Sequence, residues 1–291
     1  MRRWKNARIV GLHEPQVNED HLLGSGLSDD RRLRLLSFNI QVGNSTHSYR
    51  HYLTRSWQHL LPHKGRAGNL EKIGDLLSDF DLVALQEADG GSHRSGYINQ
   101  VKYLAQQGEF PYWYQQLNRN LGRLAQHSNG LLSRLRPSAI EDHPLPGPAG
   151  RGAILVRFGE GADALIVVIM HLALGTKTRT RQLAYIRELI GDYQHQVLMG
   201  DMNTQASDLL DTSPLRDLGL LAPQMQATFP SWRPQRCLDH ILLSPSLTLE
   251  RVQVLDQPIS DHLPVAVDIR LPGSIGGDLL PVLSSPLEPS A

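Results

Sequence analysis

The chain has 291 residues, of which 40% are hydrophobic and 20% charged, and its formal net charge is zero. This length suits one large α/β domain or two small ones, and a neutral chain has no global field to hold it on nucleic acid. The single cysteine, Cys237, excludes an internal disulfide and a cysteine-based zinc site. No window approaches the roughly 20 apolar residues of a membrane span, and the basic start lacks the apolar stretch of a signal peptide. We therefore expect a cytoplasmic protein.

The two ends differ in composition from the middle of the chain. We expect residues 1–30 to form a polar, loosely ordered lead-in and residues 272–291 a Pro/Ser-rich tail, which leaves a single domain over 31–271. In the first half of this domain, the apolar pattern predicts these elements in chain order: a strand at 33–40, a loop rich in His, Arg and Tyr, a helix over 67–80, a strand at 81–86, a helix around 97–107 and a short strand at 130–133.

The second half continues the alternation. It predicts a hairpin of 152–158 and 163–170, an amphipathic helix over 179–190, a strand at 196–200, a helical patch near 206–217, and strands at 238–243, 249–254 and 264–270. Because hairpins occur beside crossovers, this order favours an α+β fold with two sheets packed face to face and helices outside, over a purely parallel sheet.

Polar residues recur where the apolar segments end. Asp201 and Asn203 follow one strand, and two positions apart they would project the same way from an extended chain. They could equally cap a helix, where Asp and Asn are preferred. The other segment ends carry Asn39, Glu87, His171, Asp239, and the pair Asp261 and His262. Strand ends are where α/β enzymes place reactive side chains, so we expect these residues to line one cleft.

This set of side chains suits phosphoester hydrolysis. Glu87 and Asp261, with the carbonyl oxygen of Asn39, are hard ligands suited to Mg²⁺ or Mn²⁺. Asp201 can orient or deprotonate a water that Asn203 helps to hold. His171 and His262 can donate protons or hydrogen bonds to a phosphoryl group, with Asp239 fixing the tautomer of His262. The chain has neither a serine nucleophile elbow nor a Gly-rich phosphate loop, so the pattern indicates in-line attack by water.

Seven stretches together resemble the endonuclease/exonuclease/phosphatase superfamily, which contains deoxyribonuclease I, abasic-site nucleases and neutral sphingomyelinases. They are LRLLSFNIQVG at 33–43, DLVALQEAD at 81–89, SNGLLSR at 128–134, VVIMHLALG at 167–175, VLMGDMNT at 197–204, LDHILLS at 238–244 and SDHLPVAV at 260–267. The resemblance implies a four-layer sandwich of two mixed β-sheets flanked by helices, with a Mg²⁺-dependent phosphoesterase site at one edge.

Carried over residue by residue, the resemblance implies that Glu87 is the main metal ligand, with Asn39 beside it. It implies that Asp201 and Asn203 position the attacking water, and that Asp261 and His262 act at the last motif with Asp239 as the partner of the imidazole. His171 matches the histidine of the deoxyribonuclease and sphingomyelinase branches. Asn129 matches a position that supports the phosphate site.

The substrate stays open at this stage. We expect Arg181 to contact phosphate and Arg179 and Arg187 to lie on a solvated helix face. Two stretches could shape specificity: the aromatic residues 110–114 with the phosphate-compatible Asn118, Arg119 and Asn120, and residues 229–236 with Trp232. A phosphodiesterase or nuclease acting on nucleic acid is the first hypothesis. A phospholipid phosphodiesterase acting on a head group, or a phosphomonoesterase, is the second, and a non-catalytic binding protein is the third. We expect a monomer.

Overall fold

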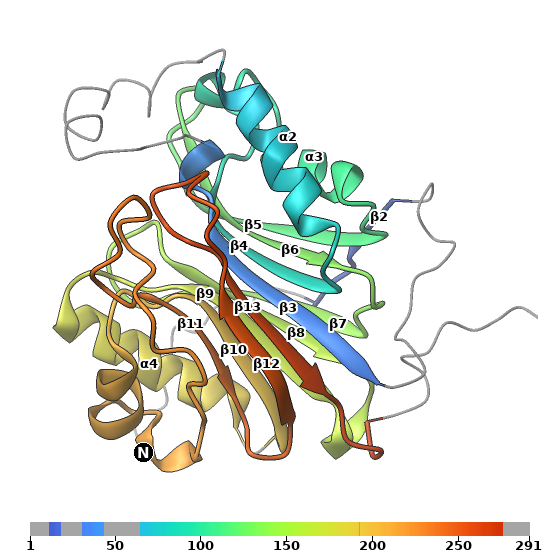
Figure 1. Cartoon of the computed structure of the whole chain (residues 1–291), viewed down its shortest axis with the longest axis vertical. Coiled ribbons are helices and arrows are strands. Elements are labelled where there is room, and N and C mark those ends of the chain that lie inside the picture. The colour runs from blue at the N-terminus through green and yellow to red at the C-terminus, as the bar shows by residue number, and fades with distance from the viewer. Residues whose placement is uncertain (1–11, 19–30, 44–64, 192, 276–291) are drawn as a thin grey trace, which may run out of the picture.

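The computed structural model describes residues 12–18, 31–43, 65–191 and 193–275, and two β-sheets dominate it (Figure 1). One sheet, called here the β10 sheet, has the strand order β1 (Leu12–His13), β7 (Ala139–Pro144), β8 (Gly152–Phe158), β9 (Leu165–His171), β10 (His195–Asp201), β11 (Asp239–Leu243). The other, the β3 sheet, has the order β12 (Thr248–Val254), β13 (Val265–Arg270), β3 (Arg32–Asn39), β4 (Leu82–Ala88), β6 (Gln126–Ser133), β5 (Tyr112–Asn120), β2 (Gln16–Val17).

Each sheet contains one parallel pair among antiparallel neighbours. β3 pairs in parallel with β4, and β9 pairs in parallel with β10. Parallel neighbours need a crossover connection. Helix α2 (Gly65–Leu77) lies in the connection of the first pair, and helix α4 (Thr176–Ile190) in that of the second. The two sheets thus repeat one β-α-β unit, and in each unit the two strands end at the same edge.

Three apolar layers hold four layers of structure together. Leu35 of β3 and Met199 of β10 belong to a core between the sheets. Phe38, on the opposite face of β3, packs with α2 and with α3 (Gln100–Gln107), whereas Leu198 packs with α4. Figure 1 shows α2 and α3 on one side of the sheets and α4 on the other. The predicted four-layer sandwich of two mixed sheets is confirmed.

Most predicted elements are present, and the errors have local causes. β5 and β7 were not expected, because their sequences, YWYQQLNRN and AIEDHP, are rich in polar residues. Some of these bond between the two sheets, as Gln116 does with Asp142. α3 starts later than predicted, since Asn99 caps it by accepting a hydrogen bond from the Lys102 backbone N–H. Within the lead-in, residues 12–13 and 16–17 pair with β7 and β5, so this part is not loosely ordered.

Some expectations fall outside the described residues: most of the lead-in, the His-, Arg- and Tyr-rich loop over 44–64, and the tail from residue 276 onward. Among the helices that are described, none has both the length and the apolar composition to cross a bilayer.

Candidate active site

At one edge of the sandwich, the inward-facing positions of several strands carry polar side chains instead of apolar ones. On β10, Val197 and Met199 face the other sheet, so Asp201 does too. The same alternation turns Asn39 of β3 inward after Leu33 and Leu35. Side chains from both sheets therefore meet where the core between them ends.

Three of these residues lie side by side in the β10 sheet. Asp201 is in register with His171 on β9 and with Asp239 on β11. All three are buried. The Nε2 atom of His171 lies 3.4 Å from Oδ2 of Asp201. The pairing of the strands, rather than a mobile loop, sets this arrangement.

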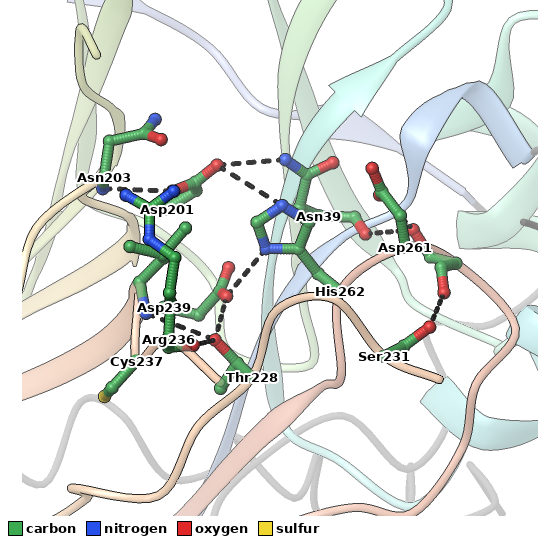
Figure 2. Close-up of polar contacts among 12 residues, drawn as sticks. Asn39, Asp201, Asn203, Thr228, Ser231, Arg236, Cys237, Asp239, Asp261 and His262 are labelled. Carbon is green, nitrogen blue, oxygen red and sulfur yellow. Dashed lines mark hydrogen bonds and ion pairs between the residues drawn. The ribbon is translucent and has the colours of Figure 1, made fainter. Parts of the chain in front are cut away.

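A hydrogen bond joins this row to the other sheet. The Asn39 amide donates to Oδ2 of Asp201 at 3.1 Å, as Figure 2 shows. The Asn39 backbone oxygen accepts from the Ser260 hydroxyl at 2.7 Å, and its side-chain oxygen accepts from the Gln41 N–H. Asn39 thus ties both sheets and the segment at 260–262 to one position.

His262 is held from behind by a carboxylate. Its Nδ1 lies 2.8 Å from Oδ2 of Asp239, which also accepts from the Thr228 hydroxyl at 2.6 Å (Figure 2). The ring of Phe229 packs against the imidazole at 4.8 Å between centroids. Burial alone would lower the pKa of His262, but Asp239 and Asp201 raise it well above its ordinary value. Its Nε2, 4.0 Å from Oδ2 of Asp201, therefore carries a proton that faces the site.

Glu87 reaches the site through a break in its strand. Leu82 and Ala84 of β4 face the core between the sheets, so simple alternation would turn Gln86 inward and Glu87 toward the helices. Instead, the register with β6 shifts between Leu85 and Ala88, and Glu87 adopts a φ of 56°. This bulge brings the carboxylate 3.9 Å from Nε2 of His171. Strained backbone of this kind is concentrated at functional sites.

The carboxylates differ in their protonation. Burial disfavours ionisation of Glu87 and Asp201, but His171 and His262 hold the pKa of both carboxyls below their ordinary values. At Asp261 burial dominates, with Glu87 and Asp201 nearby, and it raises the pKa to about 7 despite His262. A cation bound nearby would stabilise the ionised form of this carboxyl, which is buried beside other carboxylates.

The donor atoms fit a hard divalent cation. Glu87, Asp261 and Asn39 offer carboxylate and amide oxygens, the ligands that Mg²⁺ and Mn²⁺ prefer. A second group of candidate ligand atoms, from Asp201, Asp239 and His262, lies within 4.8 Å of one another. In that group, Oδ2 of Asp239 already accepts from the Thr228 hydroxyl and lies 2.8 Å from Nδ1 of His262.

The geometry at Asn203 differs from the expectation. β10 ends at Asp201, and Asn203 has a φ of 53°, so the chain is not extended there and the two side chains do not project together. The Asn203 backbone N–H donates to Oδ1 of Asp201 at 3.1 Å, and its amide group donates to the Leu172 oxygen at 3.0 Å. Asn203 therefore orients the Asp201 carboxylate directly, and only its side-chain oxygen is left to meet a ligand.

The three predicted substrate contacts lie in different surroundings. Asn129 is fully buried on β6 and donates to the Gly152 oxygen and to Gln116. Arg181 lies on the exposed face of α4, and Trp232 is half-buried in a loop whose Ser231 backbone N–H donates to the Asp261 oxygen. Their contacts with substrate stay predictions.

Two other expectations are wrong. Arg179 does not lie on a solvated face: it is buried, and it donates to the Ala173 and Leu174 oxygens in the loop between β9 and α4. The aromatic stretch 110–114 is not a specificity loop, since Phe110 and Tyr114 are buried in the cores on either face of the β3 sheet.

The sequence did not point to Arg151, which contacts the site directly. Its guanidinium lies 3.0 Å from Nδ1 of His171. Because arginine can only donate, Nδ1 accepts and the proton of a neutral His171 lies on Nε2, toward Asp201. Arg151 also lines a cavity of about 330 Å³ beside Glu87, with Arg119 and His127. These residues come from loops and polar strand ends, so no periodic pattern marks them.

Comparison with known proteins identifies the family and the fold of the chain. The model of the "Endonuclease/Exonuclease/phosphatase family" matches residues 36–262. No curated protein matches the chain. Among solved structures, an endonuclease/exonuclease/phosphatase from Beutenbergia cavernae is similar with a TM-score of 0.65 at 20% identity, and the match covers 84% of this chain and 72% of that one.

Two further structures share the fold. A mannosyl-6-phosphatase from Bacteroides thetaiotaomicron has a TM-score of 0.58 at 18% identity, covering 81% of this chain and 99% of that one. TDP2 from D. rerio, complexed with single-strand DNA product, has a TM-score of 0.59 at 15% identity, covering 83% and 100%. At these identities the likeness concerns the fold alone.

Proposed function

Because the chain belongs to the endonuclease/exonuclease/phosphatase family and is a hydrolase of phosphoester bonds, we propose that it is a Mg²⁺- or Mn²⁺-dependent phosphodiesterase or nuclease that uses water as the nucleophile. The observation that carries the proposal is the buried row His171, Asp201, Asp239, joined by Asn39 to the opposite sheet. Cytoplasmic location and a monomeric state are part of the same proposal.

Asp201 is the group that takes a proton from water. Its carboxylate accepts from Asn39 and from the Asn203 backbone, which fix its orientation, and its lowered pKa keeps it ionised at neutral pH. A general base needs this combination of fixed geometry and an unprotonated state.

The two imidazoles stabilise the phosphoryl group. Asp239 holds Nδ1 of His262 and Arg151 holds Nδ1 of His171, so both rings present Nε2–H toward Asp201. Donors fixed in advance toward developing charge cost no reorganisation during reaction. The raised pKa of His262 keeps its imidazole protonated at neutral pH.

Glu87 and Asp261, with Asn39, would hold the divalent ion. When bound, such an ion supplies Lewis-acid stabilisation of charge on a phosphoryl oxygen. The pKa of about 7 at Asp261 means that binding would release a proton from this carboxyl near neutral pH.

Activity assays on the purified protein test the proposal. The protein is assayed with Mg²⁺, with Mn²⁺ and with chelator on single-stranded DNA, a phospholipid with a cleavable head group, a model diester and phosphomonoesters. The similar D. rerio structure with DNA product makes single-stranded DNA the first substrate to try. Oligonucleotide products support the proposal, whereas inorganic phosphate or a released head group identifies the monoesterase or the lipid enzyme. Intact esters in every metal-loaded reaction would refute hydrolysis by this site.

A matched variant separates the site from general effects of substitution. Asp201→Ala removes the base, and Asp211→Ala removes an exposed carboxylate ten positions further along the chain. The proposal requires that only the first variant loses turnover.

A further inference from the structure

A cavity of about 330 Å³ opens beside Glu87, and the proposed hydrolysis does not use most of its wall. Three neighbouring strands of the β3 sheet form one side of it. Ala88 of β4, next to Glu87, is in register with Ser128 of β6, and His127 of β6 is in register with Arg119 of β5. The sheet therefore presents an acidic residue, an imidazole and a guanidinium in sequence, leading away from the site.

The opposite side of the cavity comes from the loop before β8. A Cβ built on Gly150 would lie 3.6 Å from Cδ of Arg119, so this arginine extends across the loop. Arg151, the next residue, contacts His171. The cavity wall is thus continuous from Arg119 through Gly150 and Arg151 to the catalytic row.

The charges on this wall are not balanced. Within the described ranges, the side chain of Arg119 makes no hydrogen bond or ion pair, and Arg151 has no carboxylate partner. The nearby Arg94, by contrast, is paired with Asp89 and bonded to the Gln126 oxygen. Two arginines face one glutamate on the lining, and a divalent ion held by that glutamate would make the cavity more positive still.

The excess of positive charge on this wall also affects the pKa of His127. Burial first, and then Arg94 and Arg119, lower its pKa to about 4 despite Glu87 and Asp89. The imidazole is therefore neutral at pH 7. Because Arg94 can only donate to its Nε2, at 3.4 Å, the ring proton lies on Nδ1 and can be donated to a phosphate oxygen.

We propose that Arg119, His127 and Arg151 form a subsite for a second phosphate group of the substrate, next to the phosphate that is hydrolysed. This inference rests on the proposed hydrolysis for the position of the first phosphate. A guanidinium binds phosphate oxygens through parallel N–H donors, which suits Arg119 to this role. The second phosphate is either the next one along a nucleic-acid strand or a second ester on a small phosphorylated molecule.

Two pairs of probes that differ by one phosphate test the subsite. Dithymidine monophosphate, with and without a 5′-terminal phosphate, represents a strand. Glucose 1,6-bisphosphate and glucose 6-phosphate represent a small molecule. Binding is measured by calorimetry on the full chain in chelator, where turnover stops, and kcat/KM is measured with Mg²⁺.

We expect the probe with two phosphates to bind about 10- to 100-fold more tightly in at least one pair, since a hydrogen-bonded charge pair has about this effect. Arg119→Ala should remove the preference and leave the affinity for the probe with one phosphate unchanged. Arg123→Ala is the matched control, because Arg123 is exposed on the same hairpin and does not line the cavity. The pair that shows the preference identifies the source of the second phosphate.

Equal binding within both pairs would overturn the subsite, as would an equal loss for all probes in Arg119→Ala. These results are separate from failure of the proposed hydrolysis, which would appear as absence of turnover with every ester in Mg²⁺ while the binding preference is still measured in chelator.

Discussion

Replacing Gly200 with alanine tests whether the pairing of β9 with β10 builds the site. Gly200 has a φ of 146°, and a Cβ at this position would lie 1.9 Å from the Met170 carbonyl oxygen. Ordinary contacts begin at 3.4 Å, so β10 would have to move away from β9 by about 1.5 Å. The clash is between the added Cβ and a main-chain oxygen, so no flexible side chain can rotate to relieve it.

The expected cost follows from that displacement. Paired strands lie about 4.8 Å apart, so a movement of this size breaks the nearest ladder hydrogen bonds, each worth about 1 kcal/mol. Two or three lost bonds, with about 1–3 kcal/mol of backbone strain, lower the free energy of unfolding by about 3–6 kcal/mol. Native domains have about 5–15 kcal/mol in total. The same movement takes Asp201 away from His171, its partner on β9.

Urea denaturation followed by far-UV circular dichroism measures the loss of stability, and turnover of a model diester measures the loss of alignment. Gly68→Ala is the control, since Gly68 lies on α2 with nothing within 4 Å of the added Cβ. Alanine there should stabilise the chain by up to about 1 kcal/mol. A Gly200→Ala variant within about 1 kcal/mol of the wild type, with normal turnover, would refute the reasoning.

Further predictions concern the proposed roles and the buried charges. Asp201→Ala and His262→Ala should each lower kcat by about 10³-fold or more with an unchanged circular dichroism spectrum, and a rate near that of the wild type in either would contradict the assignment. Arg151→Met should lower kcat about 10- to 100-fold and redistribute the ring proton of the histidine it contacts, as seen by ¹⁵N NMR, whereas Arg151→Lys keeps a donor and should recover part of the rate. Chelator should abolish turnover and added Mg²⁺ or Mn²⁺ should restore it; activity that persists in chelator would exclude the metal. Burial opposes ionisation of Asp89, but its arginine and serine partners keep its pKa lowered, so its stabilisation is present above the unfolded pKa of about 4 and is lost as pH falls through the lower folded value. Asp89→Asn should therefore flatten the fall in stability between about pH 4 and pH 2, and an unaltered acid limb in urea titrations would count against this.

Much of the site could be predicted because it follows from alternation along strands. Asn39, His171, Asp201 and Asp239 each continue the inward face of a buried strand, and the sequence shows where those strands end. The predicted pairing of Asp239 with His262 is present in the structure.

The other site residues depend on local features that produce no periodic pattern of apolar residues in the sequence. Glu87 faces the site only through a bulge, and Asn203 turns back through a left-handed backbone, which no apolar pattern encodes. Arg151 comes from a loop. Arg119 could be singled out as compatible with phosphate, but its place on the cavity wall depends on a strand pairing that the sequence does not show. The burial of Arg179 was missed because its hydrogen bonds go to loop carbonyls that the sequence does not place.

The hydrogen bond between Asn39 and Asp201 joins residues that are 162 positions apart in the chain. It can form only after both β-α-β units are complete and the two sheets have packed, and contacts of such long sequence separation are slow to form. Hydrolytic competence therefore belongs to the last stage of folding. A refolding chain would recover the circular dichroism signal of its helices and strands before it recovers activity. Turnover is therefore a better measure of complete folding than secondary-structure content.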